Sequence, residues 1–186
     1  MRRKDMESEN SIIREAQRGS ILAFEKILFR YEKKIFNYLY RMLGNRFDAE
    51  DTTQETFIKV YKNLVSCDPE REFSPWLYKI ATNTAYDCLR KKQGNRELSF
   101  EDLDIEILDS KIETINASKS YKLIEEANDT EIALSRLKPI HKAVLLLYYR
   151  DDLSYASIAE TLQLPMNTVK THISRAKKEL KKYYAQ

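Results

Sequence analysis

Apolar side chains recur every three or four residues along most of the chain, which is the spacing of amphipathic helices. The longest such repeat covers residues 24–42. Ser20 is placed to cap the start of this helix, and Gly44-Asn45 is placed to end it. A shorter helix is predicted before it, over residues 11–18.

Two further helices are predicted in the first half of the chain. Asp48 opens the third helix, with acidic side chains in its first turn, where the helix dipole favours negative charge. Its apolar side is predicted to consist of Phe57, Val60, Tyr61, Leu64 and Val65. The fourth helix has Ser74 as its candidate N-cap and Pro75 at its first position, and it runs to residue 92.

A second group of helices follows a stretch that lacks a helical period. Residues 97–118 mix acidic and apolar side chains, which is typical of a linker. Helices are then predicted over residues 121–137, after Pro139, over residues 154–162, and from Asn167 onward. No segment is predicted to form a strand. The pattern therefore predicts an all-α protein of two small helical domains, over 10–95 and 120–186, joined by an acidic linker over 96–119.

The charge distribution follows the same division. The 186 residues include 32 Lys and Arg and 29 Asp and Glu, a net charge of +3. The net charge is +4 over residues 1–95, −7 over residues 96–135 and +6 over residues 136–186. Two basic blocks around an acidic segment favour two nucleic-acid-binding modules on a connector, although two helical domains with ordinary solvated faces fit nearly as well.

Several classes of protein are disfavoured by what the sequence lacks. The longest apolar stretch, residues 143–149, is far shorter than the roughly 20 residues that span a bilayer, and no apolar signal segment follows the charged N-terminus. A cytoplasmic protein without membrane insertion is predicted. The two cysteines, Cys67 and Cys88, form neither a disulfide framework nor a metal motif. His141, expected at the surface, and His172 are isolated, and no glycine-rich phosphate loop is present, so no enzyme, cofactor or metal is predicted.

Residues 154–180 have the layout of a helix-turn-helix. Ser154 caps a first helix, and the second has one narrow apolar stripe that consists of Val169, Ile173, Ala176 and Leu180. The other sides of the second helix carry residues that hydrogen-bond base edges or phosphates, and none is acidic: Asn167, Thr168, Lys170, Thr171, Ser174, Arg175 and Lys178. A recognition helix in the major groove requires this composition. Gln163 stands in the turn, where many such motifs have glycine.

The fourth helix has a second informative surface. Its core face is predicted to consist of Leu77, Ile80, Ala81, Thr84 and Cys88. The opposite face interleaves cations with aromatic rings and one amide: Trp76, Lys79, Asn83, Tyr86, Arg90 and Lys91. Such a surface suits an unpaired nucleic-acid strand, because bases stack on rings and phosphates are neutralised by cations. An ordinary helix surface is the alternative for each residue taken singly.

Three segments in order resemble the extracytoplasmic-function (ECF) group of bacterial sigma factors in the sigma-70 family. They are DAEDTTQETFIKVYKNL (48–64), FSPWLYKIATNTAYDCLRKK (73–92), and the helix-turn-helix with LSYASIAE (153–160) and TVKTHISRAKKEL (168–180). The resemblance implies two domains that give RNA polymerase core enzyme its promoter specificity. Domain two would bind the polymerase clamp and capture the melted minus-ten strand, and domain four would read the minus-thirty-five duplex. Core polymerase, promoter DNA and an anti-sigma factor are the implied partners.

The resemblance also implies roles for two further groups of residues. Core polymerase is expected to bind an exposed acidic strip at the start of the third helix, formed by Asp48, Asp51, Thr52 and Glu55 with Gln54 on its flank. The loop before the fourth helix is expected to hold an extruded base, with Phe73 as its assigned residue. The competing hypothesis is a helix-turn-helix regulator that binds duplex DNA without core polymerase.

Overall fold

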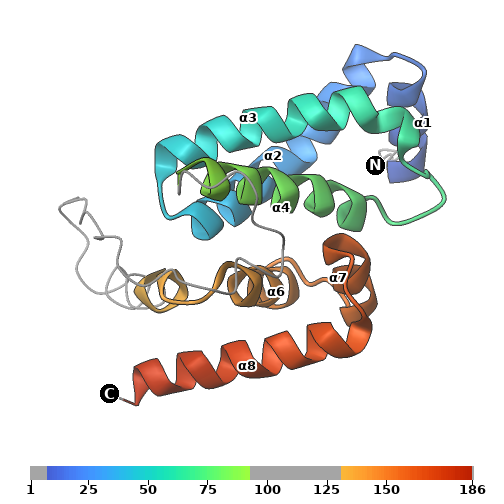
Figure 1. Cartoon of the computed structure of the whole chain (residues 1–186). Coiled ribbons are helices and arrows are strands. Elements are labelled where there is room, and N and C mark those ends of the chain that lie inside the picture. Colours follow the sequence, from blue (N-terminus) through green and yellow to red (C-terminus); the bar gives the residue numbers. More distant parts are fainter. Residues whose placement is uncertain (1–7, 93–130, 186) are drawn as a thin grey trace, which may run out of the picture.

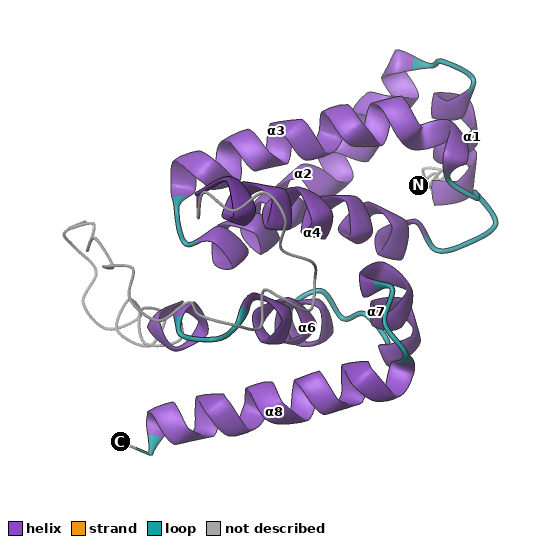
Figure 2. Ribbon diagram, viewed as in Figure 1, coloured by secondary structure: helices purple, strands orange, loops and turns teal. Residues whose placement is uncertain are grey.

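The computed structural model describes residues 8–92 and 131–185 of the chain (Figure 1). The described residues form helices and contain no strand, which confirms the all-α prediction (Figure 2). The first module contains α1 (Glu9–Gln17), α2 (Ile21–Leu43), α3 (Arg46–Asn63), a 3-10 turn (Leu64–Ser66) and α4 (Phe73–Lys92). The second contains α6 (Pro139–Tyr149), α7 (Tyr155–Leu162) and α8 (Met166–Tyr184). The predicted linker and most of the helix expected over 121–137 lie outside the described residues.

The helix ends of the first module can be compared with the caps that the sequence predicts. The Ser20 hydroxyl accepts from the Ala23 amide at 3.2 Å, and Gly44 closes α2 in the left-handed conformation with φ of 70°, both as predicted. The start of α3 is two residues earlier than predicted, because the Asn45 side chain accepts from the Asp48 amide and becomes the N-cap.

The predicted start of α4 is also wrong. This helix begins at Phe73, so Ser74 lies in its first turn and is not the N-cap. The Ser74 hydroxyl instead lies 3.3 Å from the Tyr31 hydroxyl on α2. A tertiary contact therefore uses the side chain that the local signal assigned to capping.

The core of the first module forms where α2 packs against α3 and α4. Tyr38 of α2 packs edge-on against Tyr78 of α4, with ring centroids 5.3 Å apart, and the Tyr38 hydroxyl lies 2.8 Å from Thr82 Oγ1. Burial raises the pKa of Tyr38 above its ordinary value, so this phenol stays protonated. On α3, Phe57, Val60 and Leu64 are buried as predicted. Tyr61 and Val65 are more than half exposed, which corrects the predicted apolar side.

In the second module, α8 packs against α6 and α7 (Figure 1). Val169, Ile173 and Ala176 are buried on one stripe of α8, as predicted, and Leu180 is half-buried against the same core. The Ser154 hydroxyl accepts from the Ser157 amide at 3.0 Å, so Ser154 is the N-cap of α7.

His141 is not at the surface. Only 4% of it is exposed, and its Nδ1 lies 3.1 Å from Glu179 Oε2 on α8. The prediction is wrong because α6 is covered on more than one side, by α2 of the first module and by α7 and α8 of its own.

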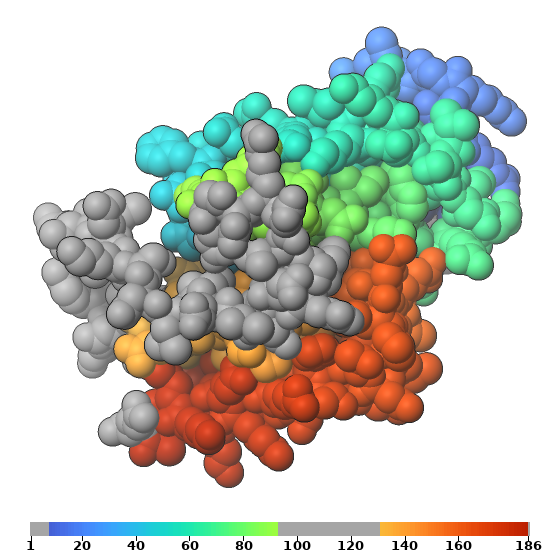
Figure 3. All heavy atoms as spheres, in the orientation of Figure 1, coloured from blue at the N-terminus to red at the C-terminus, as the bar shows by residue number. Residues whose placement is uncertain are grey.

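The two modules pack against each other. Helix α7 contacts α4, and α6 contacts α2, so α4 lies between its own module and the second one. Figure 3 shows the orange atoms of the second module directly against the green atoms of the first. None of the described helices is both long and apolar enough to cross a membrane.

The turn between α7 and α8 uses Gln163 as a left-handed cap. Gln163 has φ of 55° and ψ of 39°, and the Leu164 amide donates to the Ala159 carbonyl at 3.0 Å. This conformation crowds a Cβ atom, so glycine is the residue that it favours. Gln163 therefore stands where many such motifs have glycine, and the turn still adopts the left-handed conformation.

We expect Gln163→Gly to raise the free energy of unfolding by about 0.5–1 kcal/mol, because the relief of left-handed strain exceeds the entropy that glycine adds to the unfolded chain. Gln163→Val should lower it, since a branched Cβ fits this region poorly. Urea unfolding of the full chain measures both midpoints. A lower midpoint for Gln163→Gly would contradict the strain argument.

Candidate nucleic-acid interface

The outer face of α8 carries the residues that the sequence assigned to duplex DNA. Because the buried stripe fixes the rotation of α8, six of the seven residues are exposed, and Thr168 is half-buried. The exposed six are Asn167, Lys170, Thr171, Ser174, Arg175 and Lys178. The Thr171 hydroxyl donates to the Asn167 carbonyl at 2.9 Å, which leaves its oxygen as an acceptor toward solvent.

Glu179, the single acidic residue of α8, is turned away from this face by a contact inside the second module. Glu179 Oε2 lies 3.1 Å from His141 Nδ1, and the His141 and His172 rings have centroids 5.4 Å apart. The carboxylate is thereby held toward α6. The outer face keeps only cations and neutral hydrogen-bonding groups, which is the composition that DNA requires.

The second candidate surface lies on α4 and is narrower than predicted. Lys79, Asn83, Arg90 and Trp76 are each half-buried, so all four reach solvent, and Lys91 is exposed at the helix end. We call the first four residues the minus-ten face, after the promoter element that the sequence resemblance assigns to this region.

Two aromatic residues assigned to this region lie in the core. Tyr86 is 1% exposed, so the prediction that it lies on the open face is wrong. Helical spacing puts Tyr86 on the outer face only if α4 is buried on one side. In the structure, helices of both modules pack against α4. Phe73 is also 1% exposed, with its ring centroid 5.4 Å from that of Tyr31. A base cannot reach Phe73 unless the core repacks, and Trp76 remains as the accessible ring.

Ion pairs connect the minus-ten face to α3. Arg90 lies 3.3 Å from Asp87, Asp87 lies 3.5 Å from Lys59, and Lys59 lies 2.9 Å from Glu55. Asp87 was missed by the sequence reasoning, although its position three residues before Arg90 is a signal for a pair on one helix face. We call these four residues the ion-pair chain.

The acidic strip at the start of α3 is only partly open. Asp51 and Gln54 are exposed, whereas Asp48 is half-buried and paired with Lys92 at the end of α4. Glu55 pairs with Lys59. Thr52 is 3% exposed, so its predicted place in the strip is wrong: it faces the core, and its carbonyl accepts from the Thr56 hydroxyl.

An apolar hollow of about 380 Å³ lies beside Gln54, between α2 and α3. Its apolar lining comes from both helices, with Phe24 and Leu28 on α2 and Phe57, Ile58 and Tyr61 on α3. This hollow could not be predicted from the sequence, because it forms only when α2 and α3 pack together. An acidic strip beside an apolar hollow suits a partner helix with basic and apolar side chains.

The loop between α3 and α4 is held by the first helix. The Gln17 side-chain amide donates to the carbonyls of Leu64 and Cys67, at 2.9 and 2.7 Å. Burial raises the pKa of the Cys67 thiol to about 11, so Cys67 is a protonated core group at neutral pH. Among the described residues no cluster of side chains is suited to hold a metal ion.

Comparisons with known proteins agree with both modules. A family model described as Sigma-70 region 2 matches residues 28–95, and one described as Sigma-70, region 4 matches residues 131–180. CnrH, solved in complex with the cytosolic domain of CnrY, has a TM-score of 0.72 at 20% identity and covers 96% of this chain and 98% of its own. RpoE of Bartonella quintana, solved with the anti-sigma factor NepR, has a TM-score of 0.66 at 19% identity, over 87% and 96%. These two structures share the fold.

Sequence relatives identify the family. The ECF RNA polymerase sigma factor SigW of Bacillus subtilis is 38% identical over 174 residues, which cover 91% of this chain and 93% of that protein. The ECF RNA polymerase sigma-E factor of Escherichia coli is 30% identical over 185 residues, covering 93% and 92%. Since these relatives span both modules and carry one description, the chain belongs to the ECF RNA polymerase sigma factors.

Proposed function

We propose that this sigma factor makes one polymerase contact and two promoter contacts with three separate surfaces. The first domain, over 10–95, binds core polymerase through α3 and the melted minus-ten strand through α4. The second domain, over 120–186, reads the minus-thirty-five duplex with α8. The observation that carries the proposal is the outer face of α8, from which Glu179 is withdrawn by His141.

The minus-thirty-five contact follows from the shape and chemistry of α8. The helix is long, its buried stripe faces α6 and α7, and its outer face is free of acidic side chains. In a helix-turn-helix the second helix enters the major groove and reads base edges near its start. Asn167, Lys170 and Thr171 lie in the first turns of α8, and Arg175 and Lys178 follow farther along the same helix.

The minus-ten contact is proposed for Trp76, Lys79, Asn83 and Arg90. Trp76 offers a ring on which an unpaired base stacks, and the two cations neutralise phosphates. Asn83 is the neutral side chain of this face that both donates and accepts, as the edge of an extruded base requires. Lys91, exposed beyond Arg90, extends the phosphate contact.

Core polymerase is proposed to bind the acidic strip, and we expect Asp51→Lys with Glu55→Lys to weaken that association about tenfold or more. Both side chains reach solvent, so the double reversal leaves the core intact and sets like charges against a basic partner. Co-purification of the tagged chain with core polymerase measures the loss. Glu131→Lys, exposed in the second module, is the control. Undiminished recovery of core enzyme with the double variant would contradict the assignment.

Run-off transcription tests the whole proposal. Purified core polymerase with the chain should start transcripts at defined sites, and core polymerase alone should not. A protein that binds duplex DNA equally well without polymerase would instead be a helix-turn-helix regulator. In this proposal the chain itself catalyses no reaction, acts in the cytoplasm with the polymerase, and is inhibited by an anti-sigma factor, the class of partner that the family implies.

A further inference from the structure

The contact between the two modules contains polar contacts as well as apolar packing. The Tyr78 hydroxyl of α4 donates to Asp151 Oδ1, in the loop before α7, at 2.5 Å. The Lys142 ammonium of α6 donates to the Met42 carbonyl at the end of α2, at 3.3 Å, and Thr161 Oγ1 of α7 lies 3.2 Å from the Pro75 carbonyl. Each contact joins one module to the other.

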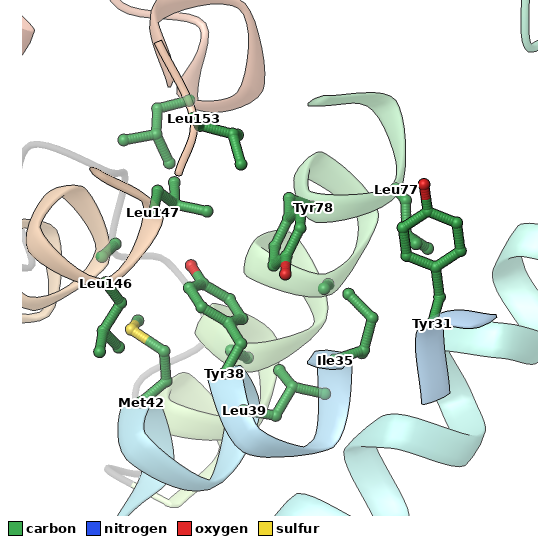
Figure 4. Packing of buried hydrophobic residues seen from close by; sticks show 14 of the residues in the cluster. Tyr31, Ile35, Tyr38, Leu39, Met42, Leu77, Tyr78, Leu146, Leu147 and Leu153 are labelled. Carbon is green, nitrogen blue, oxygen red and sulfur yellow. The ribbon is translucent and has the colours of Figure 1, made fainter. Parts of the chain in front are cut away.

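The Tyr78–Asp151 hydrogen bond lies at the edge of an apolar interface. Tyr78 is 2% exposed, and burial raises its pKa well above the ordinary value, so the phenol stays a donor. Figure 4 shows Tyr38, Tyr78 and Met42 of the first module facing Leu146, Leu147 and Leu153 of the second. These side chains shield the Tyr78 hydroxyl from water, whereas Asp151 is half-buried.

The charges around Asp151 stabilise the same contact. Burial raises the pKa of this carboxyl, while the Tyr78 hydroxyl and the cations Lys34, Arg41 and Arg150 act in the opposite direction. A hollow of about 220 Å³ between α2 and α6 is lined by these three cations together with Asp151. The Asp151 carboxylate of the second module therefore already supplies an anion to the Lys34 and Arg41 cations of the first.

The packed arrangement does not fit a promoter contacted by both modules. Helix α8 packs on α7 and α7 packs on α4, so the axes of α4 and α8 lie roughly 20 Å apart, two helix-packing distances. Elements centred about 25 base pairs apart, at minus ten and minus thirty-five, are separated by roughly 85 Å along a straight duplex at 3.4 Å per base pair. The two modules must separate before both surfaces reach DNA.

The same contact crowds the start of the minus-ten face. Arg71 lies 3.1 Å from Glu160 of α7, and Ser157 of α7 lies 3.5 Å from Glu72. These contacts and the one at Pro75 come immediately before Trp76, the first residue of that face. A strand that stacks on Trp76 would approach the surface that α7 covers.

We propose that the interface between α4 and α7 and between α2 and α6 is an autoinhibitory contact, with the Tyr78–Asp151 hydrogen bond as its latch. The free protein is held closed, and polymerase and promoter must supply the free energy of opening. The inference rests on the proposed function, because it takes α4 and α8 as the two promoter-reading helices. Breaking the latch should therefore activate the protein.

The test compares latch variants with a neighbour that carries the same charge. Asp151→Ala and Tyr78→Phe each remove the hydrogen bond, and Tyr78→Phe keeps the ring packed. Asp152→Asn is the control, because Asp152 is exposed and asparagine tolerates its positive φ of 53°. Small-angle X-ray scattering of the full chain should give a larger radius of gyration for both latch variants and the wild-type value for the control.

Transcription gives the functional arm of this test. On a promoter fragment selected with wild-type holoenzyme, half-maximal run-off transcription should need about tenfold less of either latch variant, since the closed fraction lowers apparent affinity. The Tyr78→Phe/Asp151→Ala double variant should add little to either single change, because both remove one contact. Thermal unfolding of each variant confirms that the modules remain folded.

Two results would overturn the latch: wild-type scattering for both variants, or an expanded chain that still needs the wild-type concentration in transcription. Failure of the proposed function looks different. In that case no fragment would support transcription by the wild-type protein or any variant, while scattering would still report whether Tyr78 and Asp151 hold the modules together.

Discussion

An Asn83→Ala variant should bind core polymerase normally and fail to open duplex promoters. A base must leave the stack before its edge can be read, and extrusion costs a few kcal/mol. Asn83 is half-buried on the minus-ten face, next to the cations and the ring proposed to hold the strand, and its amide both donates and accepts. Loss of these hydrogen bonds should cost about 1–3 kcal/mol, or roughly 5- to 150-fold in open complexes.

Permanganate footprinting on duplex promoters measures the melting, and a pre-melted template measures base preference at each minus-ten position. Lys79→Ala, one turn earlier on the same face, is the matched control: it should weaken all sequences alike and leave base preference intact. Since Tyr86 is buried, Trp76 is the ring expected to stack. Wild-type melting together with wild-type base preference in Asn83→Ala would remove Asn83 from the site.

On α8, Arg175→Ala and Lys178→Ala should differ in kind. Both side chains are exposed on the outer face. If Arg175 reads a base edge, its loss costs about 1–3 kcal/mol and relaxes preference at one position of the minus-thirty-five element. If Lys178 contacts phosphate, its loss weakens every sequence alike and lowers the slope of log affinity against log salt by about one.

Titration of matched and scrambled minus-thirty-five duplexes at several salt concentrations separates the two roles. Lys182→Ala, two turns beyond Arg175 on an exposed part of α8, serves as the control for charge alone. If Arg175→Ala and Lys178→Ala lower the affinity for both duplexes by the same factor, the assignment of the reading face is wrong.

Local sequence signals correctly predicted features that depend on a single helix. The caps at Ser20, Gly44 and Ser154 follow from side chain-to-backbone contacts and φ preferences of single residues. The buried stripe of α8 follows from spacing alone, because α8 packs on its neighbours with one side.

The sequence predictions failed where two or more helices decide the outcome. Tyr86 and Thr52 were placed outward by a helical spacing argument that assumes one buried face, and His141 was placed at the surface because it lies near a helix start. Each of these helices is covered on several sides. Phe73 was assigned to the loop before the fourth helix, whereas it is the first residue of α4. The hollow beside Gln54 and the latch at Tyr78 depend on pairings between distant segments, which periodicity does not encode.

The ion-pair chain from Glu55 through Lys59 and Asp87 to Arg90 joins the proposed polymerase site on α3 to the proposed strand site on α4. It would therefore link the two binding free energies. If a polymerase cation binds Glu55 as proposed, Lys59 would be released toward Asp87, and Arg90 would become available to a phosphate. The exchange would also run backwards, because a phosphate on Arg90 would return Asp87 to Lys59 and expose Glu55. Coupling free energies are reciprocal, so the factor by which polymerase strengthens strand binding must equal the factor by which the strand strengthens polymerase binding.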